Sequence, residues 1–188
     1  MGDSFSTEEA WPDMDAKEAL IPVSLNIYAL GTNGAGRFLN SLLSPLGTGA
    51  FHCGVEIMGC EWSFRSTPGW KGNGVFWCPP QQCKSHTFVE SIHMGYCRMS
   101  DVAIMTLVQD LTSSWPAADY HVLRRNCCHF SDEVCKRLGV GGIPHRFMSL
   151  ADACALPFGP LCDFVEEEED FEVLACDLLE EEEFEILA

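Results

Sequence analysis

The stretch YHVLRRNCCHFSDEV, residues 120–134, decides the predicted fold, because it reads as a strand that runs directly into a helix. The segment YHVLRR, residues 120–125, has the residue types of a strand. Asn126 is a residue type that caps helices. An apolar residue then recurs at every fourth position, as on one face of a helix: Phe130, Val134 and Leu138.

Further strands are predicted upstream of this stretch. VSLNIYAL, residues 23–30, alternates apolar and polar side chains, which is typical of a strand. FHCGVEIMGCEWSF, residues 51–64, reads as a hairpin with Gly59 near its turn. Residues 75–77 and TFVESIHMGYC, residues 87–97, read as two more strands.

Two more helices are predicted between the strands. NGAGRFLNSLLSPLG, residues 33–47, has helical spacing of apolar residues and ends at a proline and a glycine. Ser100 is positioned to cap a second helix. The predicted apolar face of that helix consists of Ile104, Met105, Val108 and Leu111. The sequence therefore predicts an α+β domain, with a small antiparallel sheet packed against helices, over residues 21–158.

The formal charge of −17 lies mainly in the C-terminal segment. Residues 163–188 hold 13 acidic residues and no basic one, so residues 159–188 are predicted to be an acidic, disordered tail. Residues 1–20 are polar and aperiodic and read as a flexible arm. No segment offers a basic surface, which argues against nucleic acid as a partner.

The 11 cysteines indicate a reducing compartment more than a disulfide scaffold, because the N-terminus has no secretory apolar region. We therefore expect a cytoplasmic protein, with the nucleus as a second location. No apolar run is long enough for a transmembrane span. Met1-Gly2 with Ser6 fits the myristoylation pattern, so Gly2 is a candidate lipidation site that would give weak membrane contact.

Cys127 follows the predicted helix cap directly, where backbone N–H groups and the helix dipole favour a thiolate. The same N–H groups could hold the oxyanion of an acyl intermediate. A nucleophilic cysteine also needs a base that is close in space. From the residues alone, His52 and His121 rank ahead of the other histidines, and His129 is expected to support the neighbouring backbone.

Two other interpretations of the cysteine pair are weaker. A zinc site could combine Cys127, Cys128, His129 and Cys135 with Cys78 and Cys83, but no C-x₂-C pair occurs in the chain. We therefore predict no metal and no cofactor. A Cys127–Cys128 disulfide would be strained, which makes Cys128 a candidate redox partner rather than a structural one.

Several segments, in this order, resemble the PPPDE or desumoylating isopeptidase family of papain-like cysteine peptidases with a circularly permuted fold. FHCGVEIMGCEWSF is similar to the family's segment with a histidine before G-[IV]-E. VESIHMGYC is similar to its E-S-I/V-x-L-G-x-T strand. The other segments that carry the resemblance are PVSLNIYAL, YHVLRRNCCHFSDEVCKRL and GIPHRFMSLA, residues 142–151.

The resemblance implies that Cys127 is the nucleophile and His52 the base of a dyad, in a cysteine isopeptidase that removes SUMO or ubiquitin-like modifiers from lysines. The implied partners are proteins conjugated to SUMO or ubiquitin. The chain departs from the family where Cys128 replaces the usual asparagine, where Cys53 replaces serine or threonine, and where the closing Asn-Arg pair is lost.

The acidic tail contains two copies of an acidic run followed by Phe-Glu-aliphatic-Leu. Each copy resembles a SUMO-interaction motif, in which a short hydrophobic strand adds to a sheet edge beside acidic flanks. The candidate modifier-binding residues are Phe171, Val173, Leu174, Phe184, Ile186 and Leu187.

Two other functions fit the same residues. A papain-type thiol acyltransferase or thioesterase, similar to lecithin:retinol acyltransferase, would use Cys127 and His52 on a lipid or thioester. A catalytically silent adaptor would bind ubiquitin-like proteins without chemistry.

Overall fold

The computed structural model describes residues 20–29, 51–66, 72–84 and 86–148. The predicted arm before residue 20, the helix predicted at 33–47, the lipidation candidate Gly2 and the whole acidic tail lie outside these residues. Their predictions therefore stay predictions.

Five antiparallel strands form one sheet in the order β4-β3-β2-β1-β5. The strands are β1 (Ile21–Ala29), β2 (Phe51–Ile57), β3 (Cys60–Phe64), β4 (Val75–Cys78) and β5 (Thr87–Cys97). All four predicted strand regions upstream of residue 100 are thus confirmed. The helices are α2 (Asp101–Ser114) and α3 (Cys127–Arg137), with short 3-10 turns at Ala117–Asp119 and His145–Phe147. The predicted α+β class with a small antiparallel sheet is confirmed.

The β2–β3 hairpin forms where the sequence predicts it. Met58 and Gly59 both have positive φ angles, 53° and 75°, as a two-residue hairpin turn requires. Ile57 pairs with Cys60 across this turn, and Val55 pairs with Trp62. This register places Ser63 of β3 near the start of β2, where His52 lies.

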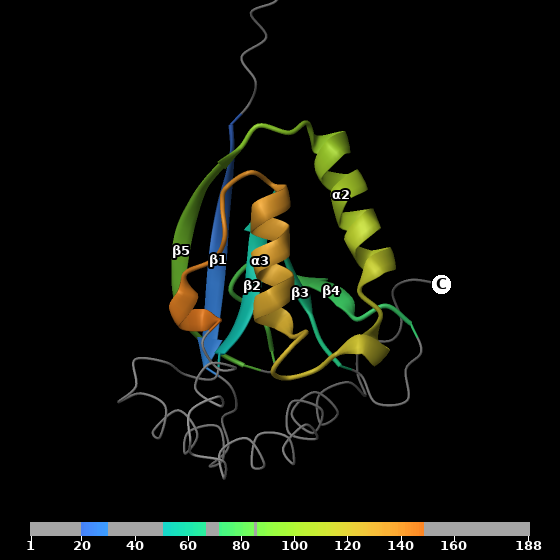
Figure 1. The fold of residues 1–188 in the computed structure, drawn as a ribbon. Coiled ribbons are helices and arrows are strands. Elements are labelled where there is room, and N and C mark those ends of the chain that lie inside the picture. The colour runs from blue at the N-terminus through green and yellow to red at the C-terminus, as the bar shows by residue number, and fades with distance from the viewer. Residues whose placement is uncertain (1–19, 30–50, 67–71, 85, 149–188) are drawn as a thin grey trace, which may run out of the picture.

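α3 lies over one face of the sheet and packs against β2 and β3, while α2 lies to one side of it (Figure 1). The predicted stripe Phe130, Val134 and Leu138 is buried in the core, as expected. The core also takes residues from β1 and from α2, among them Val23, Leu25, Ile27, Ile104 and Leu111.

Two local predictions are wrong. Residues 120–125 form a turn with a single bridge between His121 and Arg125 instead of a strand. In α2, Met105 is 49% exposed, and Leu107 takes its place on the buried face. The cap at Ser100 is confirmed, because its side chain accepts a hydrogen bond from the Ala103 N–H.

Among the described residues, no helix is both long enough and apolar enough to cross a membrane.

Candidate active site

Cys127 is the first residue of α3, and a capping box fixes the helix at that point. The Asn126 side chain accepts a hydrogen bond from the His129 N–H at 3.1 Å, and the Asn126 N–H donates to His129 Nδ1 at 3.4 Å. The predicted supporting role of His129 is thereby confirmed. The capping box holds the Cys127 side chain at the N-terminal end of the helix, next to the start of β2.

The Cys127 sulfur lies 3.8 Å from the carbonyl oxygen of Phe51, and His52, the next residue on β2, acts to lower the pKa of the thiol. Both side chains are buried, each with 2% of its surface exposed. The structure therefore brings together the two residues that the resemblance pairs. His121 makes a different contact, since its Nδ1 accepts the Leu123 N–H within the turn that precedes α3.

Ser63 of β3 fixes the protonation pattern of the His52 ring. The Ser63 hydroxyl donates to the carbonyl oxygen of Cys53 at 2.6 Å, and its oxygen lies 3.1 Å from His52 Nε2. A hydroxyl has one proton, so Ser63 can only accept from His52. In the neutral ring the proton therefore sits on Nε2, and Nδ1 keeps the lone pair that can accept a proton.

Cys127 also belongs to a group of three thiols. Its hydrogen bond with Cys128, together with burial, raises the pKa of Cys127 well above its usual range, although His52 acts in the opposite direction. Cys128 in turn lies 3.4 Å from Cys53, sulfur to sulfur. The described cysteines are all free thiols, so the predicted redox role of Cys128 stays a prediction.

Aromatic rings surround His52. Tyr28 meets it edge-on at 5.9 Å between ring centroids, and Phe76 and His86 stack on it at 6.2 and 4.4 Å. Burial and the neighbouring His52 lower the pKa of His86 to about 2, so its ring is neutral. His52 and Cys53 point to opposite faces of β2, and both faces are buried.

A buried carboxylate, that of Glu61, contacts Tyr28, one of the aromatic residues around His52. Glu61 is 1% exposed and accepts hydrogen bonds from the Tyr28 hydroxyl at 2.7 and 2.8 Å, from Asn26 Nδ2 at 2.6 Å and from the Gln81 N–H at 2.8 Å. Burial and the contact with Glu61 raise the pKa of Tyr28, which keeps its hydroxyl protonated. Gly54 leaves room for Glu61, since a Cβ at Gly54 would clash with the Glu61 carboxylate.

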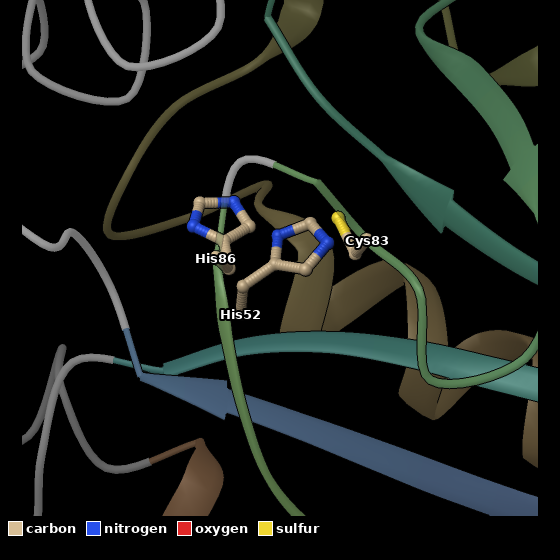
Figure 2. A group of neighbouring side chains, drawn as sticks. All are labelled: His52, Cys83 and His86. Atoms are coloured by element: carbon tan, nitrogen blue, oxygen red, sulfur yellow. The ribbon is translucent and has the colours of Figure 1, made fainter.

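The candidate metal ligands that lie close together in the structure differ from those considered from the sequence. Within the described part of the chain, one group of three or more His, Cys, Asp or Glu side chains has ligand atoms within 4.8 Å of one another, and it consists of His52, Cys83 and His86 (Figure 2).

Sequence reasoning missed Ser63, Tyr28 and Glu61. A glutamate between Cys60 and Trp62 in a predicted strand was a local signal of a buried, hydrogen-bonded charge. Ser63 had no such signal, because only the β2–β3 register brings it to His52.

Comparison with known proteins identifies the class of this domain. Residues 21–164 match the family described as the "PPPDE putative peptidase domain", and the chain belongs to this family of peptidases. It is 30% identical over 159 residues to a DeSI-like protein of Arabidopsis thaliana, a match that covers 82% of this chain and 67% of the plant protein.

A desumoylating isopeptidase 1 homolog of Caenorhabditis elegans is 32% identical over 145 residues, covering 74% of this chain and 41% of the nematode protein. DeSI-like protein sdu1 of Schizosaccharomyces pombe is 27% identical over 142 residues, covering 72% of this chain and 66% of the yeast protein. The chain thus matches less than half of the nematode relative's length.

Proposed function

We propose that this chain is a cysteine isopeptidase that removes SUMO or a related ubiquitin-like modifier from lysine side chains. The observation that carries the proposal is the position of Cys127 at the first residue of α3, with its thiol against the start of β2 beside His52, in a chain of a peptidase family. The names of the relatives support SUMO conjugates as the substrate class. A circularly permuted papain-like fold is part of the same proposal.

The raised pKa of Cys127 favours one form of the resting site, a neutral thiol beside a neutral imidazole. In the proposed first step, His52 Nδ1 takes the thiol proton as the sulfur attacks the isopeptide carbonyl carbon. Ser63 accepts a hydrogen bond from Nε2 throughout and stabilises the imidazolium. Backbone N–H groups of the first turn of α3 would stabilise the oxyanion.

The second half of the reaction returns the site to its starting state. The carbon–nitrogen bond breaks, and His52 gives its proton to the departing lysine amine, leaving a thioester on Cys127. Water then attacks the thioester while His52 takes a proton from it. The carbon–sulfur bond breaks, His52 returns its proton to the Cys127 sulfur, and the modifier leaves as a carboxylic acid that loses the remaining water proton to solvent.

Hydrolysis of matched substrates tests this proposal. Reduced protein is incubated with SUMO and with ubiquitin, each linked to a lysine side chain of a peptide, and with a long-chain acyl thioester. Release of the lysine peptide that disappears in Cys127→Ser and His52→Ala supports the isopeptidase. Turnover of the thioester alone would favour the acyltransferase or thioesterase.

One observation favours a second function, a binding module without chemistry. Cys127 is almost completely buried and its pKa is raised, and both features oppose a reactive thiol. Such a module would bind SUMO and leave all three substrates intact.

A further inference from the structure

Three side chains, one of them the histidine of the proposed dyad, form a group of potential metal ligands. The proposed reaction gives no role to the other two. His52 comes from β2, and Cys83 and His86 come from the segment between β4 and β5. Their ligand atoms all lie within 4.8 Å of one another, and Figure 2 shows the three side chains clustered together. Cys83 is 7% exposed and His52 2%, whereas His86 is partly exposed, so the cluster is mostly buried.

The chemistry of this donor set suits zinc. One sulfur and two imidazole nitrogens are typical zinc ligands, and three protein ligands leave the fourth position of a tetrahedral site open. With ordinary Zn–N and Zn–S bond lengths, the donor atoms of such a site lie about 3.3–3.6 Å apart. The distances between the donor atoms, which are at most 4.8 Å, therefore have to shorten by up to about 1.2–1.5 Å to hold the ion.

A second observation concerns His86. Its Nδ1 is buried and has no hydrogen-bond partner among the described residues, so no bond from this nitrogen fixes the ring. A polar ring atom buried in this way is uncommon and needs an explanation. The ring stacks on His52 with 27° between the planes, and it has to turn before its lone pair can converge with that of His52. A ring without a hydrogen bond at Nδ1 can make this turn.

Ser63 prepares His52 for the same role. A metal-bound histidine commonly donates its second ring N–H to a neighbouring acceptor, which orients the ring. Ser63 accepts from Nε2 and leaves the Nδ1 lone pair for a ligand. A metal on Nδ1 would occupy the atom that the proposed reaction needs as a base.

We propose that His52, Cys83 and His86 form a Zn²⁺ site, and that zinc bound there reversibly blocks the enzyme by occupying the base. Zinc binding stands on the cluster alone, whereas the block rests on the proposed isopeptidase function. Binding forms two Zn–N bonds and one Zn–S bond, and the Cys83 thiol loses its proton to solvent when the metal binds.

Cobalt binding tests the site without any need for activity. Full-length, reduced, metal-free protein carrying Cys127→Ser is titrated with Co²⁺, whose absorption reports thiolate ligation and tetrahedral geometry. Zn²⁺ affinity is then measured by competition. The ligand variants are Cys83→Ser and His86→Phe. The matched controls, Cys60→Ser and His93→Gln, remove a cysteine and a histidine outside the cluster.

We expect one equivalent of Co²⁺ with a thiolate band that Zn²⁺ displaces. Each ligand variant should weaken Zn²⁺ binding about 100-fold or more, since even the loss of an outer hydrogen-bond partner costs 10- to 100-fold. The controls should bind as the parent does. Absence of the band, or equal binding by all variants through scattered thiols, would overturn the proposal.

Activity separates this inference from the proposed function. In protein with Cys127 intact, zinc should inhibit isopeptide hydrolysis, a chelator should restore it, and His86→Phe should lose this response relative to its own zinc-free rate. Hydrolysis that zinc does not affect would contradict the proposed inhibition by zinc but not the zinc site itself. Inactive zinc-free protein that still binds Co²⁺ would contradict the isopeptidase and leave the metal site in place.

Discussion

Replacing Ser63 by alanine tests how the site controls the proposed base. The substitution removes the oxygen that accepts from His52 Nε2 at 3.1 Å and donates to the Cys53 carbonyl at 2.6 Å. Because Ser63 is 1% exposed, water cannot readily replace its hydroxyl. The His52 ring then loses the partner that keeps its proton on Nε2.

The expected effect on rate follows from the charge that His52 gains. A hydrogen bond to a neutral group contributes about 0.5–1.5 kcal/mol, and one to a charged group about 1.5–3 kcal/mol. Only the difference between these two contributions, which arises when the imidazolium forms, affects kcat. This difference is about 1–2 kcal/mol. At about 1.4 kcal/mol per factor of ten, Ser63→Ala should lower kcat about 5- to 30-fold. The free energy of unfolding should fall by about 1–3 kcal/mol, because a buried N–H is left unpaired.

Ser131→Ala is the matched control. Ser131 is fully buried on α3, one turn after Cys127, but its hydroxyl has no partner among the described residues. Its removal should change stability by less than about 0.5 kcal/mol, since no hydrogen bond is lost. Ser63→Thr, which keeps the hydroxyl, should restore most of kcat if its added methyl group is accommodated.

Kinetics with the isopeptide substrate, urea unfolding and ¹⁵N NMR of the histidine rings give the readouts. A merely structural serine would not set the tautomer of His52, so NMR is the decisive measurement. A wild-type His52 protonated on Nδ1, or equal kcat in Ser63→Ala and Ser131→Ala, would refute the reasoning.

Three more predictions concern stability and the tail. Gly54→Ala should cost about 3 kcal/mol or more in urea unfolding, because the added Cβ displaces the buried, hydrogen-bonded Glu61 carboxylate; a loss below about 1 kcal/mol would contradict this. Burial raises the pKa of Cys135 from 9.0 to about 12, so its stabilising effect is complete below pH 9 and declines as the pH rises towards 12. Relative to Cys135→Val, the wild type should lose about 1.4 kcal/mol of unfolding free energy between pH 7 and pH 10, and a difference independent of pH would count against the raised pKa. A labelled peptide of residues 163–188 should bind SUMO in a fluorescence titration and lose binding when its six candidate hydrophobic residues become alanine; no binding up to millimolar SUMO would end this idea.

Elements with strong local signals could be predicted from the sequence. The β2–β3 hairpin follows from alternating side chains around Gly59, and the start of α3 follows from the cap at Asn126. The strand predicted at 120–125 failed because local side-chain contacts outweighed strand propensity. His121 accepts the Leu123 N–H, and the Asn126 side chain donates to the Val122 carbonyl, which folds these residues into a turn.

The site could be predicted only in part. The resemblance paired Cys127 with His52, and the structure places the Cys127 thiol at the start of β2, where His52 acts to lower its pKa. Ser63, Cys83 and His86 reach His52 through strand register and the chain between β4 and β5, which no local pattern encodes. The exposed Met105 shows the same limit, because helical spacing allows a neighbouring residue, here Leu107, to face the core.

Covalent trapping of the nucleophile tests the central claim most directly. Reduced, zinc-free protein is treated with SUMO and ubiquitin that carry a C-terminal propargyl or vinyl-sulfone group, and the adduct is mapped by mass spectrometry. Cys128→Ser serves as the matched control beside Cys127→Ser and His52→Ala. We predict a single adduct on Cys127 that is lost with Cys127→Ser, strongly reduced with His52→Ala and retained with Cys128→Ser. An adduct on Cys128, or no adduct on folded protein, would contradict the claim that Cys127 is the nucleophile of an isopeptidase.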